Sequence, residues 1–283
     1  MIRIVADSTC DLSPELKDKY GVAILPLFIR LGDEEYRDGE NITPDEIYRW
    51  ADAHHQTPKT AACDMETAKK LFREIAQAGD EAVCFAISGH MSTTVNAMRL
   101  AAEEAGAQDR VLVVDTQNLS TGGGLLVLAA ADMARQGCSL PEIAEAVEEL
   151  RGRVRASFVV DTLTYLHRGG RCSGVAALMG GALRLHPKIV VQEGRMQPEK
   201  KYRGRMSHVV MNYVRDMEES LRRADSARVF ITHSGCDQAL LDEVKAYLTG
   251  LGRFREILIT RAGGVISSHC GPGTLGVLYV SGE

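Results

Sequence analysis

The sequence has few aromatic residues, no long apolar run and no closely spaced cysteines. Aromatic residues make up 5% of the 283 residues. No apolar run reaches the roughly 18 residues needed to cross a bilayer, and Asp7 interrupts the first apolar segment too early for a secretory signal. We therefore expect a soluble, cytoplasmic protein.

The seven cysteines are odd in number, lie far apart and include no C-x-x-C pair. Disulfide frameworks and zinc sites both depend on closely or regularly spaced cysteines. The sequence therefore predicts reduced thiols, no metal site and no other cofactor.

Charge is unevenly distributed along the chain, although the formal net charge is only -5. Residues 1–150 contain 13 Lys/Arg and 26 Asp/Glu, whereas residues 151–205 contain 12 and 3. A basic segment of this kind can bind nucleic acid, but this one lacks an interleaved set of aromatic residues and a helix-turn-helix pattern. We favour a docking face for an acidic protein, or for the phosphates of a nucleotide held by a partner, and expect no nucleic-acid partner.

The first half of the chain alternates short apolar runs with amphipathic segments, which is typical of α/β proteins. Thr43 is followed by a proline and Ser139 by a Leu-Pro pair, and each has a Glu three residues further on. This is the pattern of a capping box at a helix start. We predict strands at 2–6, 22–29, 82–87 and 110–114, and helices that begin near residues 14, 44, 65, 94 and 140.

The second half is patterned differently and predicts a second α/β domain with a mixed sheet. We predict strands at 158–161, 228–232, 256–260 and 274–280, a hairpin at 188–197, one long helix from 206 past 221, and a helix at 237–251. The change of pattern divides the chain into domains 1–153 and 154–283.

Two glycine motifs resemble nucleotide-binding loops but lack the required context. The segment 271–276 matches G-x-G-x-x-G, but a strand rather than a helix is expected after it, so we predict a tight loop. Gly122-Gly123-Gly124 lacks the Lys-Ser/Thr of a P-loop, so we expect close packing at a helix start.

Hydroxyls and one imidazole are candidates for holding an anion. Ser92 and Thr93 follow a predicted buried strand and precede a helix, where they either accept an anion or cap the helix. Thr60 stands in a predicted turn, and His269 follows an apolar segment beside glycines. Hydroxyls and an imidazole can jointly hold a carboxylate. Cys270 beside His269 suggests a thiol nucleophile, but this role is disfavoured because neighbouring side chains in an extended chain point in opposite directions.

The string Leu163–Ser173 contains two glycines followed by Arg171. Two glycines let the backbone turn sharply and present a guanidinium from a constrained loop. The alternative is a helix C-cap with an exposed arginine.

These strings, taken in order, resemble the DegV family of bacterial fatty-acid-binding proteins. The matching segments are 6–9, 26–27 with 36–38, 58–60, 87–88 with 92–94, 114–116, 163–171 and 269–273. The resemblance implies a two-domain DegV-like fold with a ligand between the domains. It comprises an N-terminal Rossmann-like three-layer α/β domain and a C-terminal α/β domain with a mixed sheet.

By this resemblance the protein is a lipid carrier, not an enzyme, and presents a long-chain fatty acid to a separate fatty acid kinase for acyl phosphate formation in phospholipid synthesis. The residues that hold the carboxylate would be Thr60, Ser92, Thr93 and His269, and Arg171 and Arg203 would face the kinase. We expect Leu27, Ile29, Leu163 and Leu178 to line the acyl tunnel. Transient contact with a membrane fits lipid exchange.

The sequence departs from the family pattern in two loops. Ala61-Ala62-Cys63 replaces the usual Ser-Gln-Pro after Thr60, and Thr93 stands where glycine is usual. The chain length and unsaturation of the ligand therefore stay open. Two other functions also stay open: an acyl ester hydrolase that uses Ser92 or Cys270 with His269, and a regulatory protein that binds nucleic acid through residues 151–205.

Overall fold

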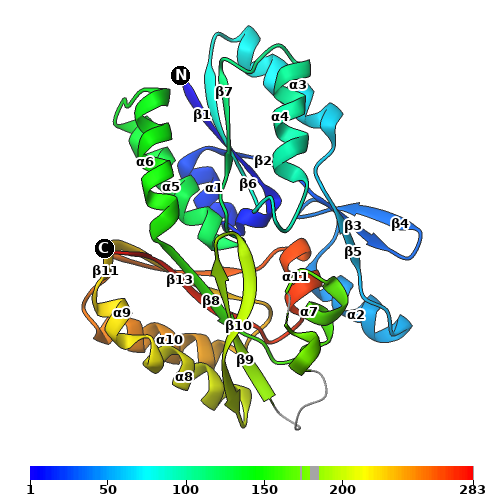
Figure 1. Cartoon of the computed structure of the whole chain (residues 1–283), viewed down its shortest axis with the longest axis vertical. Coiled ribbons are helices and arrows are strands. Elements are labelled where there is room, and N and C mark those ends of the chain that lie inside the picture. Colours follow the sequence, from blue (N-terminus) through cyan, green and yellow to red (C-terminus); the bar gives the residue numbers. More distant parts are fainter. Residues whose placement is uncertain (173, 179–184, 283) are drawn as a thin grey trace.

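Three β-sheets organise the protein in the computed structural model, which describes residues 1–172, 174–178 and 185–282 (Figure 1). The first is a parallel sheet with the strand order β2-β1-β6-β7. Its strands are β1 (Ile2–Asp7), β2 (Val22–Leu25), β6 (Glu81–Ala86) and β7 (Val111–Asp115). One face is covered by α1 (Pro14–Tyr20), α5 (Thr121–Arg135) and α6 (Leu140–Arg153), and the other by α3 (Met65–Gln77) and α4 (Thr94–Glu104). The predicted three-layer arrangement is confirmed.

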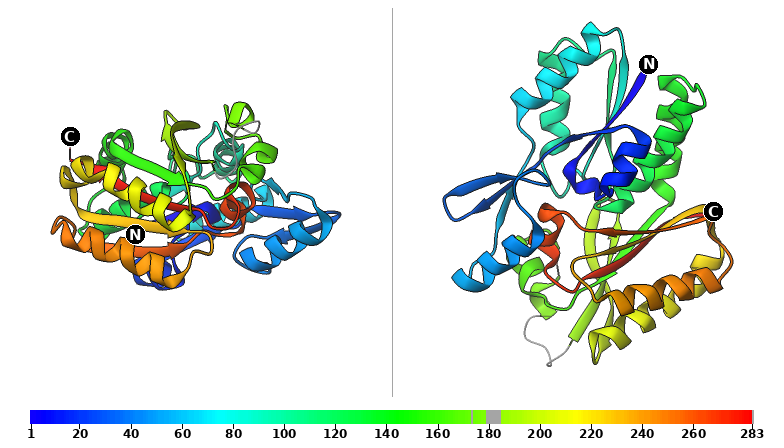
Figure 2. Two further views of the ribbon diagram at one scale, coloured as in Figure 1. Left: turned by 90° about the horizontal axis from the view of Figure 1, so that it is seen from below. Right: turned by 180° about the vertical axis from the view of Figure 1, so that it is seen from behind.

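A small antiparallel sheet, with the order β4-β3-β5, projects to one side together with α2 (Pro44–His54) (Figure 2). Its strands are β3 (Phe28–Leu31), β4 (Glu34–Arg37) and β5 (Lys59–Ala61). The prediction of one strand at 22–29 was therefore wrong, because β2 and β3 belong to different sheets. Pro26 lies between the two strands. Because proline has no backbone N–H, it would interrupt the hydrogen bonds of a sheet if a single strand ran through it.

The mixed sheet has the order β10-β9-β8-β13-β11-β12, and only β11 and β12 are parallel neighbours. Its strands are β8 (Val154–Val159), β9 (Leu185–Gln192), β10 (Arg195–Arg203), β11 (Ala224–His233), β12 (Glu256–Arg261) and β13 (Leu275–Ser281). One face packs on α8 (Met206–Asp216), α9 (Glu218–Arg222) and α10 (Gln238–Gly250). On the other face Phe230 and Leu278 share a core with α5, so the two halves are joined through apolar packing.

Four short segments complete the described chain, namely η1 (Ser8–Cys10), α7 (Thr164–Gly169), η2 (Ala176–Leu178) and α11 (Gly264–Cys270). Helix α11 comes from the second half of the sequence but packs against α2, α7 and the small sheet (Figure 1). Ser173, the last residue of the Arg171 string, lies outside the described residues.

Local signals located most helix starts and were less reliable for element lengths. Both predicted capping boxes are confirmed at Thr43 and Ser139, and Gly122-Gly123-Gly124 does stand at the start of a helix, α5. The single long helix was wrong, because α8 and α9 are separated at Met217. Strand β8 begins at Val154, directly after α6; the division into domains at 153/154 stays a prediction. No helix among the described residues is long and apolar enough to cross a membrane.

Candidate functional site

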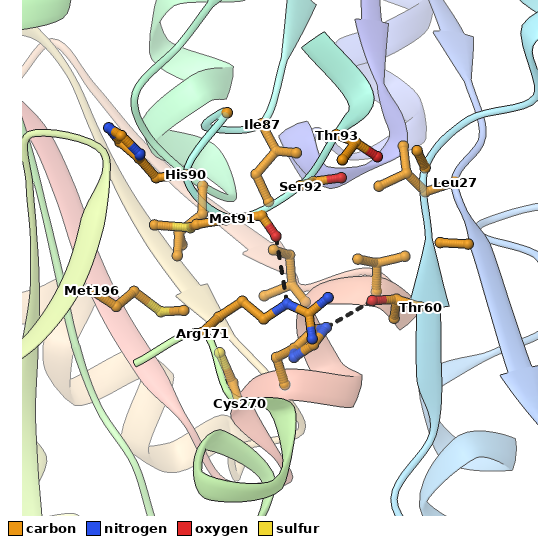
Figure 3. A pocket seen from close by; sticks show the side chains of 17 residues that line it. Leu27, Thr60, Ile87, His90, Met91, Ser92, Thr93, Arg171, Met196 and Cys270 are labelled. Atoms are coloured by element: carbon orange, nitrogen blue, oxygen red, sulfur yellow. Dashed lines mark hydrogen bonds between the residues drawn. The ribbon is translucent and has the colours of Figure 1, made fainter. Parts of the chain in front are cut away.

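A cavity of about 300 Å³ lies where the β6–α4 loop, β5, β10 and α11 meet (Figure 3). Its volume is at the lower end of the range usual for small-molecule pockets. The apolar part of its wall is buried and consists of Leu27, Ile87, Met91, Leu119, Met196, Val265 and Ile266. The polar side chains of the wall are Thr60, His90, Ser92, Thr93, Arg171 and His269. The cavity is therefore an apolar space with a polar region in its wall.

Thr60 and His269 meet in this wall, although 209 positions separate them in the sequence. Thr60 Oγ1 lies 2.8 Å from His269 Nε2 (Figure 3). Two local predictions were wrong here: Thr60 belongs to strand β5 rather than to a turn, and His269 belongs to helix α11 rather than to extended chain. The helical backbone lets both His269 and Cys270 line the cavity.

The other ring nitrogen of His269, Nδ1, is buried and has no hydrogen-bond partner among the described residues. It faces Gly169 at the end of α7, where an added Cβ would lie only 2.4 Å away. Burial, together with the smaller effect of the charge of Arg171, lowers the pKa of His269 to about 4. The imidazole is therefore neutral at pH 7.

The environment of His269 also favours one tautomer. A buried N–H without an acceptor costs more than a bare lone pair, so Nδ1 carries no proton and Nε2–H donates to Thr60 Oγ1. The Thr60 hydroxyl proton is then free to donate to a ligand in the cavity.

Ser92 and Thr93 lie at the start of α4 and differ in their hydrogen bonds. Ser92 Oγ accepts from Thr94 N at 3.3 Å and lies 2.8 Å from Thr94 Oγ1. Thr93 is exposed, occupies the N-cap position and makes no side-chain cap bond. Its φ of -81° suits a β-branched residue, so the departure from the usual glycine brings no backbone strain.

Arg171 follows the C-cap of α7, as the helix-cap interpretation expects, and it also lines the cavity. Its guanidinium donates to Gly169 O at 2.6 Å and reaches Met91 O at 3.5 Å (Figure 3). Arg203 is exposed at the far end of β10. Cys172, the neighbour of Arg171, forms an isolated backbone β-bridge with Met196, which lies seven residues before Arg203 on β10. At about 3.3 Å per residue along a strand, Arg171 and Arg203 therefore lie roughly 20 Å apart.

Of the four residues expected to line a tunnel, only Leu27 lines this cavity. Ile29 lies in the core beneath α11, and Leu178 is buried in η2. Leu163 is partly buried and packs against the apolar cluster that contains Ile266. A second cavity of about 30 Å³ shares Leu119, Ile266 and Cys270 with the first. A second apolar space therefore lies toward the mixed sheet, on the other side of these three side chains.

Most of the apolar lining lies outside the residues that the sequence predicted. Ile87 and Met91 flank the serine cluster that was recognised, so their place in the string was an available signal. Met196 and Ile266 come from the hairpin and from α11, which reach the cavity only through long-range packing.

Neither of the two hydrolase candidates, Ser92 and Cys270, is hydrogen-bonded to His269 among the described residues. His269 is bonded to Thr60, and Ser92 is bonded to Thr94. Burial raises the pKa of Cys270 to about 12, so its thiol stays protonated at neutral pH. Across residues 1–172, 174–178 and 185–282, no group of three or more His, Cys, Asp or Glu side chains is arranged to hold a metal ion.

A parallel-sheet half and a mixed-sheet half around a mainly apolar cavity define a two-part α/β protein. The chain belongs to the DegV family, described as a family of uncharacterised proteins, whose sequence profile matches residues 1–282. A DegV domain-containing protein from Deinococcus radiodurans is 34% identical over 281 residues, which cover 98% of this chain and 97% of that protein.

Solved structures of similar chains support the same fold. The structure of a DegV family protein from Thermus thermophilus, reported for its fatty acid binding, is 34% identical and superposes with a TM-score of 0.88 over 99% of both chains. Protein TM841 from Thermotoga maritima, reported to reveal a fatty acid binding function, is 26% identical with a TM-score of 0.84 over 99% of both chains. A stearic acid-binding protein from Eubacterium ventriosum is 26% identical with a TM-score of 0.87, over 100% of this chain and 99% of that one. The predicted DegV-like fold is confirmed.

Proposed function

We propose that this protein binds one long-chain fatty acid in the cavity, with the carboxylate at Thr60, Ser92, Thr93 and His269. The observation that carries the proposal is the pairing in one cavity of a buried apolar wall with hydroxyl donors, of which the Thr60 hydroxyl is oriented by His269. A carboxylate that leaves water needs such donors to offset its lost hydration. The fatty acid binding reported for the similar structures from Thermus thermophilus and Thermotoga maritima supports this ligand.

The acyl chain would run from the polar wall toward Leu119, Ile266 and Cys270. Each buried CH₂ contributes about 0.8 kcal/mol, so the apolar wall provides most of the affinity and the carboxylate contacts set the orientation. The space behind these three side chains is narrow, about 30 Å³, so a long chain requires them to move apart.

We further propose that the protein is a carrier rather than an enzyme and presents the carboxylate to a separate fatty acid kinase. Arg171 lines the cavity beside the proposed carboxylate site and is positioned to meet the transferred phosphate, whereas exposed Arg203 contributes to docking. A bidentate guanidinium suits phosphate recognition.

The test is acyl phosphate formation from oleic acid with ATP and a bacterial fatty acid kinase, compared with oleic acid binding measured separately. Ser92→Ala is expected to weaken binding several-fold, whereas Arg203→Ala should bind normally and lower only the rate of phosphorylation. An equal loss of binding in Arg203→Ala contradicts its partner-facing role. Turnover of acyl esters that is lost in His269→Ala would instead favour the hydrolase.

A further inference from the structure

Two buried carboxylates from the first half of the chain hold the N-terminus of α11. Asp11 Oδ1 accepts a hydrogen bond from Gly263 N at 2.8 Å, and Asp38 Oδ1 accepts one from Gly264 N at 2.7 Å. The two aspartates are 5% and 2% exposed. Because α11 carries His269 in its last turn, these bonds lie at the opposite end of the helix from the cavity donor.

The glycines at this helix start let the carboxylates approach closely. A Cβ added at Gly263 would lie 3.1 Å from Asp11 Oδ1, and one added at Gly264 would lie 3.0 Å from Asp38 Oδ1 and 2.6 Å from Ile29 Cδ1. The backbone of α11 therefore rests directly on the two aspartates and on the core of the first half.

This arrangement costs folding free energy. Burial raises the pKa of Asp11 and Asp38, and the charge of Asp38 raises that of Asp11 further. Asp38 Oδ2 is buried and, within the described residues, has no hydrogen-bond partner. The Ser8 hydroxyl, whose oxygen accepts from Leu27 N, and the backbone of Gly264 and Val265 partly offset this rise in the pKa of Asp38. A buried unpaired carboxylate oxygen calls for a functional explanation.

We propose that Asp38, assisted by Asp11, is a positioning residue for the carboxylate site: it fixes the start of α11 so that His269 reaches Thr60. The charge-assisted bond to Gly264 N is stronger than a bond to a neutral acceptor and is favoured at a helix N-terminus. The effect on ligand binding rests on the proposed function, whereas the placement of His269 does not.

The experiment uses Asp38→Asn, which keeps an acceptor for Gly264 N but removes the charge. The control is Asp80→Asn, which changes another buried aspartate, 7% exposed, that pairs with Arg3 and the N-terminus away from the cavity. The decisive readout is the titration of His269 by nitrogen-15 NMR, and oleic acid affinity is measured alongside.

In Asp38→Asn the midpoint of His269 should rise from about 4 toward the ordinary 6.5, because a loosened α11 lets water reach the ring. Oleic acid should bind about ten-fold more weakly. Asp80→Asn should change neither value. An unchanged His269 midpoint in Asp38→Asn overturns the positioning role.

A second variant covers the case in which Asp38→Asn does not fold. Gly264→Ala keeps Asp38 but pushes α11 away from it, and it should raise the His269 midpoint in the same direction; an unchanged midpoint counts against the proposal. If the wild-type protein binds no fatty acid while Asp38→Asn still shifts the midpoint, the proposed ligand fails and the positioning role stands.

Discussion

At the scale of residues, the proposed carboxylate site depends on the contact between Thr60 and His269. The sequence offered both as hydroxyl and imidazole candidates, but only the order of the family-like strings made them specific, since an isolated threonine or histidine has many structural roles. Their contact spans 209 positions and depends on the packing of α11 against β5. No local pattern could have predicted it. The same holds for the bare Nδ1, which depends on the approach of Gly169.

Thr60→Val should weaken fatty acid binding about ten-fold. Valine keeps the shape of threonine but removes the hydroxyl that donates to the ligand and accepts from His269 Nε2, and such a bond contributes about 1–2 kcal/mol. Isothermal titration calorimetry measures the effect. The matched control is Thr249→Val on α10, which removes an exposed hydroxyl that donates to Lys245 O. This variant should bind the fatty acid as the wild type does.

His269 should make the protein less stable as the pH falls below 6.5. The unfolded chain binds a proton at this histidine near pH 6.5, whereas the folded protein does so only near pH 4. Between these values the free energy of unfolding falls by up to about 1.4 kcal/mol per pH unit from this group alone. Below pH 4 both states are protonated and the loss is complete.

The check is urea unfolding of the wild type and of His269→Gln at pH 6.5, 5.5 and 4.5. Burial raises the pKa of Asp7 to about 6, which acts in the opposite direction but equally in both proteins. The wild type should therefore lose stability more steeply than His269→Gln. Parallel pH profiles would show that the imidazole is not held neutral.

At the scale of elements, the sequence predicted the elements with strong local signals and missed those held by distant contacts. The starts of α2 and α6 were correct because capping boxes and N-terminal prolines specify them locally. Helix α11 was missed because it begins with two glycines, which are poor helix formers, and its first turn is held by Asp11 and Asp38 from far away. The division of 22–29 into β2 and β3 likewise follows from their pairing in separate sheets.

Gly169→Ala should lower both stability and ligand affinity. Its Cβ would lie 2.4 Å from His269 Nδ1, so α7 and α11 must separate, which costs about 1–3 kcal/mol for overpacking. The control is Gly152→Ala in α6, where nothing lies within 4 Å of the added Cβ. Alanine should stabilise that helix by about 0.5–1 kcal/mol and leave binding unchanged. Equal melting temperatures for the two variants would contradict the close packing of α7 on His269.

At the scale of the whole molecule, the two halves are joined around the cavity rather than merely linked in sequence. Arg228 of β11 donates to Asp132 of α5 at 2.7 Å, to Glu256 of β12 at 2.6 Å and to the Tyr20 hydroxyl at 2.8 Å. Beside it, Phe230 and Leu278 pack on α5. The alternation of strands and helices predicted two α/β halves, but the cavity between them depends on how these surfaces fit.

Native mass spectrometry of the purified protein shows whether the apolar cavity holds one fatty acid. The account predicts a mass increase equal to one long-chain fatty acid per chain, which organic extraction releases and identifies. It also predicts that Thr60→Val retains less of this ligand than Thr249→Val. A protein that carries no lipid and takes up neither added palmitic acid nor added oleic acid would contradict the account.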